Sequence, residues 1–254
     1  MKKLIFLLII PFVVLITSCD DNTVTPIPTG NIYLTSIPAG AEIWIDGSNT
    51  FSTTPDTINN VSEGARNVTL KLQDYNDTTF SVTVTENQTS VVTNIVLVSD
   101  INTTFYGTSP SVRLYESFGT PSSQPSGLDL SSGMAYGVSS SESDLIDIYF
   151  YSDASGNSYL IQSADLYPSL VRETDFFVSS GTNLFDEEDS PLRSSGTWTD
   201  NIDDTENNYV FLYDHDDHYS KFKIVLRGGG GGPGDPSWVD VQWYYNNTQL
   251  DNRF

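Results

Sequence analysis

Two long stretches of the chain alternate apolar and polar residues with a period of two, which is typical of strands with one buried and one solvent-facing side. The first stretch covers residues 31–98, where short turn signals such as Asp46-Gly47 separate the alternating runs. The second covers residues 126–254, and its clearest alternating runs are 146–150 and 239–245. Neither stretch has a sustained helical period, so the pattern predicts an all-β protein.

The two alternating stretches also predict two domains. Short strands at this spacing favour small antiparallel sandwiches. We therefore expect two antiparallel β-sandwich domains, the first over residues 30–98 and the second over residues 126–254. Residues 99–125 between them contain Pro110, Pro121 and many Ser and Thr. We interpret this region as a linker that includes a possible first strand of the second domain.

The N-terminal residues follow a different pattern. Lys2 and Lys3 precede an apolar run from Leu4 to Ile16, and small residues follow the run. A basic start, a short apolar segment and a small-residue cleavage site predict a secretory signal peptide, here residues 1–18. The run is shorter than the roughly 20 apolar residues that span a bilayer, so we expect cleavage rather than a membrane helix.

The end of this segment, Ile16-Thr17-Ser18-Cys19, resembles the lipobox of bacterial lipoproteins. The resemblance implies cleavage before Cys19, diacylglycerol on its sulfur, and usually a third acyl chain such as palmitate on the new amino terminus. Two or more acyl chains anchor a protein stably to a membrane. Residues 19–29 would then form a lipidated tether, which Pro26 and Pro28 keep extended.

The same resemblance implies a location in the cell envelope, at the outer membrane or cell surface rather than the inner membrane. Asp20-Asp21 resembles an inner-membrane retention signal in one bacterial group and a surface-export signal in others, so the choice of membrane stays open. Cys19 is the only cysteine of the chain. No disulfide can therefore form within the fold.

The composition is strongly acidic, with 33 Asp and Glu against 11 Lys and Arg and a formal net charge of -22. Binding to nucleic acid depends on Lys and Arg that neutralise phosphates, so we exclude nucleic acid as a partner. Anionic lipid headgroups repel such a chain in the same way. We therefore expect membrane contact only through the lipid on Cys19.

The turn motifs of the first stretch occur in a particular order: Pro38-Ala39-Gly40-Ala41, Asp46-Gly47, Thr54-Pro55 and Glu63-Gly64. This order resembles the PEGA domain, which is named for its Pro-Glu-Gly-Ala turn. One departure is Asp74-Tyr75, where the family usually has Gly-Tyr, but Asp tolerates a left-handed backbone better than most residues. The resemblance implies an accessory envelope module without catalysis. The residues expected to build its turns are Pro38, Gly40, Ala41, Asp46, Gly47, Pro55 and Gly64.

The second stretch resembles the HmuY-like haem-binding lipoproteins at residues 128–133, 147–150 and 219–224 and in its closing strand. The haem ligands of that family are two histidines well separated in sequence. This chain has only His215 and His218, which lie in one segment. The haem function is therefore not implied by the resemblance.

Three groups of acidic residues are candidate metal sites, although no cofactor is required by the pattern. In the segment 214–218, His215, Asp217 and His218 are suitable ligands for zinc or another transition metal. A metal needs three or four convergent donors, and the alternative is a solvated acidic turn. The runs 186–189 and 200–206 could supply oxygens to calcium, but neither matches an EF-hand loop, and the alternative is a charged surface loop.

Motifs of common hydrolases are absent from the sequence: it has neither a Gly-x-Ser-x-Gly elbow nor a His-Glu-x-x-His pair. We therefore expect a non-catalytic envelope lipoprotein that acts as a structural or binding module for cell-wall glycans, surface glycans or envelope proteins. One alternative is capture of haem, a metal ion or a glycan by the second domain. Another is a glycosidase that uses two carboxylates. Glycan binding is also suggested by aromatic residues on polar phases or in loops, although a partner sheet could cover them: Trp44, Trp198, Trp238 and Tyr244.

Overall fold

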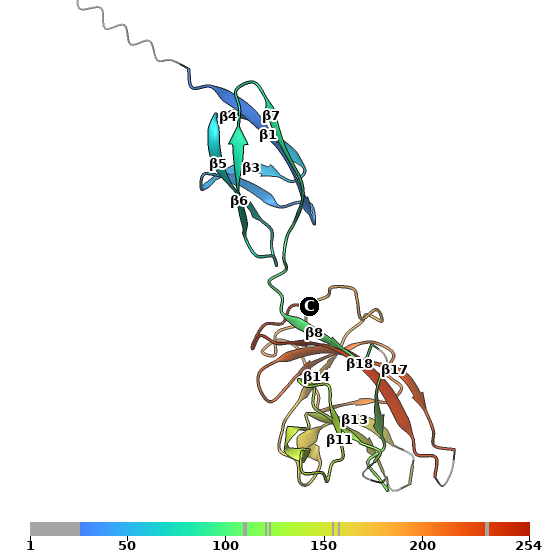
Figure 1. The fold of residues 1–254 in the computed structure, drawn as a ribbon. Helices are drawn as coiled ribbons and strands as arrows, with labels where there is room; N and C mark the ends of the chain where they lie inside the picture. The colour runs from blue at the N-terminus through green and yellow to red at the C-terminus, as the bar shows by residue number, and fades with distance from the viewer. Residues whose placement is uncertain are drawn as a thin grey trace, which may run out of the picture. The chain divides into compact units, whose positions relative to one another are not determined.

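The computed structural model describes residues 26–108, 111–119, 121, 123–153, 155–156, 158–231 and 234–254. They form two compact units, drawn in Figure 1. The first unit contains the described residues up to Leu72 and Asp77–Leu97, and the second contains Gln73–Asn76 and Val98–Phe254. The predicted signal peptide, Cys19 and most of the predicted tether lie outside the described residues.

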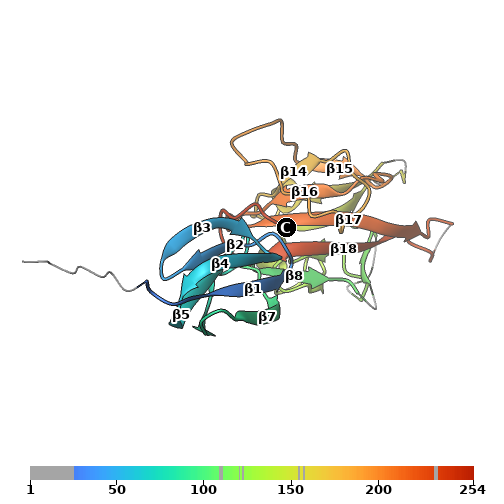
Figure 2. The ribbon, with the colours of Figure 1, turned by 90° about the horizontal axis from the view of Figure 1, so that it is seen from above.

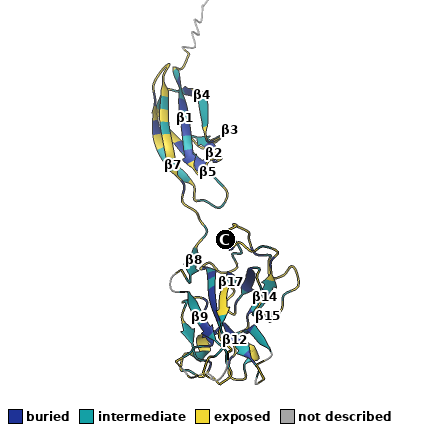
Figure 3. Ribbon diagram, turned by 90° about the vertical axis from the view of Figure 1, so that its right-hand side faces the viewer, coloured by how far each residue is buried: buried dark blue, intermediate teal, exposed yellow. Residues whose placement is uncertain are grey.

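The first unit is built from seven strands: β1 (Thr29–Ile37), β2 (Glu42–Ile45), β3 (Ser48–Thr53), β4 (Asp56–Ser62), β5 (Gly64–Lys71), β6 (Thr78–Val84) and β7 (Thr89–Val96). They form one sheet with the order β4-β1-β7 and another with the order β3-β2-β5-β6, and Figure 2 shows the strands from above. Apolar side chains that alternate along the strands fill its core, as in β1, where buried and less buried residues alternate (Figure 3). The core residues include Ile32, Leu34, Ile43, Val68 and Leu70.

One pairing of the first unit departs from the expected antiparallel arrangement. β1 pairs with β4 in the antiparallel sense, but with β7 in the parallel sense. Parallel neighbours need a long crossover connection, and here the strands β2 to β6 provide it. The all-β sandwich prediction is confirmed, with this one parallel pair as the difference.

The described residues of the second unit form eleven strands: β8 (Thr103–Tyr106), β9 (Val112–Tyr115), β10 (Gly127–Leu128), β11 (Ala135–Tyr136), β12 (Ile148–Ser152), β13 (Tyr159–Ser163), β14 (Asp175–Val178), β15 (Asn201–Asp203), β16 (Val210–Tyr213), β17 (Tyr219–Gly228) and β18 (Trp238–Asn246). One sheet has the order β11-β10-β12-β13-β15. The other has the order β14-β16-β17-β18-β8, and β9 also pairs with β18. Two strands within residues 99–125 therefore belong to this second sheet.

Helical structure is limited to short 3-10 turns in the described part of the chain, at η1 (Ser143–Leu145) and η2 (Ala164–Leu166). None of the described segments forms a helix that has the length and apolar character needed to cross a membrane.

Large apolar side chains fill the space between the two sheets of the second unit. Trp243 of β18 is fully buried, and its ring stacks on Tyr106 of β8 at a centroid distance of 4.9 Å. Its indole Nε1 donates a hydrogen bond of 2.9 Å to the carbonyl oxygen of Leu130. Phe150 of β12 and Phe222 of β17 contribute to the same core cluster. The inward-facing apolar side chains of both sheets therefore form one continuous core, as expected for a sandwich.

The opposite face of the β14-β16-β17-β18-β8 sheet carries a second, aromatic core. Tyr209, directly before β16, and Phe211 within β16 are buried there with Leu184. Phe105, Phe177, Trp198, Tyr244 and Phe254 pack against these residues. Because Leu184 and Trp198 belong to the connection between β14 and β15, we call residues 179–200 the covering segment. Both faces of this sheet are therefore covered by protein.

Candidate functional site

The motif residues of the first unit form turns. Gly40 has a φ of 96° between β1 and β2, in the left-handed region where glycine avoids steric strain. Its amide donates to the carbonyl of Thr54 at 2.7 Å, and the amide of buried Ala41 donates to the Thr54 hydroxyl at 3.1 Å. The Pro38 turn and the Thr54-Pro55 turn are thus held together, which gives a physical reason for the two motifs to occur in one domain.

Asp46-Gly47 makes the hairpin turn between β2 and β3, with φ values of 50° and 81°. Two positive φ values match the tight turns that join antiparallel strands. The Asp46 carboxylate accepts a hydrogen bond of 2.9 Å from the Asn67 amide and one of 3.2 Å from Arg66, and these contacts lower the pKa of Asp46. Gly64 opens β5 with a φ of 109°. The carboxylate of this motif therefore forms hydrogen bonds that stabilise the turn.

Asp74, which stands where the PEGA family usually has Gly, has a φ of 64°. This is the left-handed region, where Asp and Asn are enriched among residues other than glycine. The structure agrees with the expectation that aspartate adopts this backbone conformation.

The segment 214–218 connects β16 to β17 and places its side chains in different surroundings. The Nδ1 atom of His218 donates a hydrogen bond of 2.8 Å to the carbonyl oxygen of Asn246. Asp217 accepts a hydrogen bond of 2.6 Å from Tyr213, and His215 is exposed. Within the described residues, no three His, Cys, Asp or Glu side chains form a group that could hold a metal ion. The structure therefore does not bring His215, Asp217 and His218 together as ligands.

A buried ion pair lies beneath this segment. Asp147 has no solvent exposure, and it accepts hydrogen bonds of 2.7 Å from Arg172 Nε and 2.8 Å from the Leu130 amide. Arg172 also donates through Nη2 to Asp216 at 2.6 Å. Burial raises the pKa of Asp147 to about 7, against the opposing charge of Arg172. This network ties the 214–218 segment to the core, and the alternation pattern did not reveal it.

The acidic run 186–189 is bound to a buried lysine. Lys221 of β17 is fully buried, and its ammonium contacts Asp186 and donates to the Glu188 carbonyl at 3.1 Å. The Glu188 carboxylate accepts a hydrogen bond from the Tyr209 hydroxyl, and Asp189 accepts one of 3.0 Å from the Phe254 amide. Asp186 and Glu188 therefore hold the covering segment on the sheet, and Asp189 holds it on the C-terminal residue Phe254.

The second acidic run makes mostly local contacts. Asp203 accepts hydrogen bonds from the amide and hydroxyl of Thr205, and Glu206 accepts one of 2.8 Å from the Asn208 amide. Asp204 lies 4.0 Å from Arg227. These contacts are typical of turns whose carboxylates cap backbone amides.

The four aromatic residues that suggested glycan binding have different surroundings within their units. The Arg113 guanidinium covers Trp238 at 3.5 Å from the ring centroid, and the Lys71 ammonium lies 5.3 Å from the centroid of Trp44. Trp198 packs in the aromatic core, 5.6 Å from Phe177. Tyr244 also belongs to that core, but it lines an open cleft.

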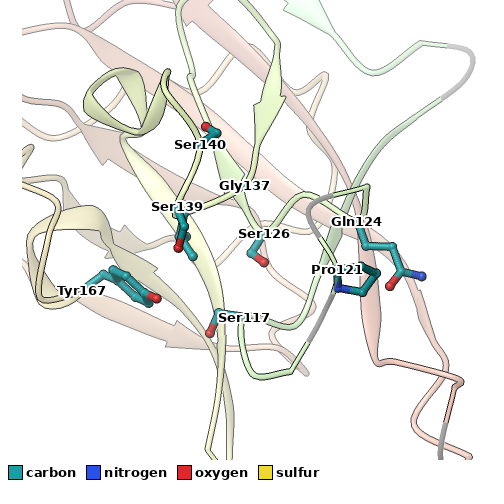
Figure 4. Close-up of a pocket in the computed structure, with 9 residues that line it drawn as sticks. Ser117, Pro121, Gln124, Ser126, Gly137, Ser139, Ser140 and Tyr167 are labelled. Carbon is teal, nitrogen blue, oxygen red and sulfur yellow. The ribbon is translucent and has the colours of Figure 1, made fainter.

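A small cleft lined by hydroxyl groups lies on the second unit (Figure 4). Its volume is about 170 Å³, and the Tyr167 ring lies on the side opposite Gln124. The Ser140 hydroxyl oxygen is buried and makes no hydrogen bond among the described residues. None of the described lining residues is a histidine or a carboxylate. The serine side chains come from three segments, at positions 117, 126 and 139–140.

Comparison with known protein families places part of the chain. Residues 29–98 match the family described as the PEGA domain. The match ends before β8, the first strand of the second unit. No curated protein matches the chain. The predicted resemblance of the first stretch is confirmed by this match, and residues 29–98 form a PEGA domain.

Proposed function

We propose that the chain is a bacterial lipoprotein that carries a PEGA domain and a second β-sandwich in the cell envelope, as a non-catalytic structural or binding component. The observation that carries the proposal is the position of the PEGA domain, which begins at residue 29 directly after a segment with the features of a lipoprotein signal and a tether. Lipid on Cys19 would hold both units at the outer membrane or the cell surface.

Lipid anchoring is tested by comparing the full chain with its Cys19→Ser variant in a bacterial host. We expect the wild type to enter the membrane and detergent-rich fractions, and mass spectrometry to find an acylated amino-terminal cysteine. The variant should lose both properties, since stable anchoring requires two or more acyl chains. Equal membrane binding of both proteins, or an unmodified mature terminus, would refute the proposal. Protease treatment of intact cells then distinguishes two locations of the chain: it should digest a chain on the cell surface and leave intact a chain that faces the inside of the outer membrane.

Two observations support a role without catalysis. The motif residues of the PEGA domain form hydrogen bonds within turns, and the described residues that line the serine cleft include no histidine or carboxylate, the most common general bases. Release of reducing sugar or peptide from a panel of cell-wall substrates by the purified chain would contradict this part of the proposal.

Ligand capture by the second unit is a second candidate function. The serine cleft favours it, because hydroxyl groups beside an aromatic ring suit a small polar ligand such as a sugar. A glycan array probed with the wild type and with Tyr167→Ala tests this role, and binding that the substitution leaves unchanged would exclude the cleft. Metal or haem capture through the 214–218 segment is tested by the double variant His215→Ala, His218→Ala, and binding that this variant leaves unchanged would exclude the segment.

A further inference from the structure

A second cleft of the second unit lies at the edge of the aromatic core. It has a volume of about 250 Å³ and is lined by Leu184, Phe185, Glu187, Lys221, Tyr244 and Phe254. The covering segment supplies Leu184, Phe185 and Glu187, and the sheet supplies Lys221 and Tyr244. Phe185 remains 59% exposed although it is a large apolar residue. Exposed aromatic residues beside a cleft indicate a binding surface more often than isolated ones do.

The rings at this cleft meet at steep angles. Phe185 lies 6.0 Å from Tyr244, with an angle of 86° between the ring planes, and 5.4 Å from Phe105, with an angle of 62°. Phe105 packs behind Tyr244 at 4.6 Å and supports its ring. Walls set at such angles present ring faces from more than one direction. A sugar ring instead favours one flat aromatic surface with several hydrogen-bonding side chains around it.

The charge at the cleft favours a cation. The Glu187 carboxylate makes no hydrogen bond or ion pair within the described part of the chain, and the exposed residue has a φ of 57°. The single positive group, Lys221, is neutralised by Asp186 and turned toward the Tyr209 ring, 4.4 Å from its centroid. Aromatic faces attract cations through their quadrupole, and several faces together form the cages that bind quaternary ammonium groups.

We propose that this cleft binds a small alkylated ammonium group of the choline type, with Phe185 and Tyr244 as ring walls and Glu187 as the counter-charge. The proposal goes beyond the envelope role and does not depend on it, since the cleft is formed by the second unit alone. A primary ammonium keeps its water shell more strongly, whereas alkyl groups present apolar surface to the rings.

The test uses the full chain in a non-ionic detergent, titrated with choline and with its neutral tert-butyl analogue, in which carbon replaces the quaternary nitrogen. Calorimetry should detect choline binding, and the neutral analogue should bind about tenfold more weakly, since it lacks the cation–π attraction. N-acetylglucosamine serves as the sugar probe. We expect no saturable binding of this sugar at the cleft.

Variants then assign the site. Phe185→Ala should weaken choline binding about tenfold, and Glu187→Gln about threefold, as for an exposed charge pair. Phe51→Ala, at a phenylalanine of the first unit that is 92% exposed, is the matched control and should bind as the wild type does. Glu187→Gln changes only an exposed side chain, so it keeps the test valid if Phe185→Ala lowers stability. Equal affinity for choline and its neutral analogue, sugar binding that Phe185→Ala abolishes, or no choline binding at all would overturn the proposal.

Discussion

Some ionisable side chains of this protein are buried, where desolvation makes a charge unfavourable. Asp147 and Lys221 are both fully buried, and each is matched by a partner of opposite sign, Arg172 for the aspartate and Asp186 for the lysine. Replacing both members of such a pair by apolar residues is often harmless, but removing one member leaves a buried charge without compensation. Each pair holds a loop residue, Arg172 beside the residue that precedes β12 and Asp186 against Lys221 of β17, so both pairs fix loop conformation.

The first residue-scale prediction concerns Asp147. Its folded-state pKa is about 7, whereas a carboxyl in the unfolded chain titrates near pH 4. Between about pH 4 and 7 the folded chain keeps a proton that the unfolded chain has lost, so the contribution of Asp147 to stability falls as pH rises through this window. We expect the difference in unfolding free energy between wild type and Asp147→Asn to decrease over this range in urea titrations.

The exposed Asp144 supplies the control for this prediction. Asp144→Asn makes the same substitution at an exposed position and should change the free energy of unfolding by no more than about 0.5 kcal/mol. A difference between wild type and Asp147→Asn that is constant from about pH 4 to 7 would show that Arg172 keeps Asp147 ionised throughout.

The second residue-scale prediction concerns Lys221. Lys221→Ala removes the cation that holds the covering segment and should lower the free energy of unfolding by about 3–5 kcal/mol. Arg227→Ala is the control, since the Arg227 side chain is 53% exposed and pairs only distantly with Asp204; its effect should stay below about 1 kcal/mol. Equal urea midpoints for the two variants would mean that the buried contact between Lys221 and Asp186 does not stabilise the fold.

At the scale of elements, β1 is the central strand of its sheet in the first unit. It pairs with β4 on one side and β7 on the other, and its inward residues Ile32 and Leu34 have no solvent exposure. Gly30, near its start, lies against the segment that joins β6 to β7. A Cβ atom there would lie 2.3 Å from the Thr85 carbonyl oxygen and 2.8 Å from that of Gln88.

The element-scale prediction follows from this close approach. Gly30→Ala forces two backbone segments apart and should destabilise the first unit by about 1–3 kcal/mol, the usual cost of overpacking. Thr93→Ala on the exposed side of β7 is the control, with an expected effect within about 0.5 kcal/mol. Hydrogen exchange of the β1 amides measures the effect locally, and unchanged protection in Gly30→Ala would contradict the prediction.

At the scale of the whole molecule, the dominant property is the net charge of -22. Like charges repel one another more in the compact state than in the expanded chain, so a strongly acidic protein is destabilised by its own charge. Salt screens this repulsion, since the Debye length falls from about 30 Å at 0.01 M to about 3 Å at 1 M.

We therefore expect the thermal unfolding midpoint to rise as sodium chloride increases from about 0.01 M to about 1 M. Sodium and potassium chloride should act equally, because screening depends on ionic strength. A lower midpoint in salt would mean that ion pairs such as Arg172–Asp147 outweigh the repulsion. A response to one cation alone would indicate specific ion binding.

The sequence by itself determined the features that depend on near neighbours. Period-two alternation predicted strands, because successive side chains of a strand point to opposite faces. The order of the turn motifs at Pro38, Gly40, Asp46 and Gly64 resembles the PEGA domain, and the family match confirms this resemblance. The left-handed turns at Gly40 and Gly64 depend on local dihedral angles that glycine adopts without strain. Asp74 was predicted to tolerate a left-handed conformation for the same local reason.

The tertiary structure alone decided which faces are covered and which groups meet. Lys221 lies on the polar phase of its strand, yet the covering segment buries it against Asp186. The parallel pairing of β1 with β7 and the joining of β8 to β18 depend on contacts between residues far apart in sequence. Alternation describes a strand and its two faces, but the partner of each face is chosen by long-range packing, so these features had no local signal.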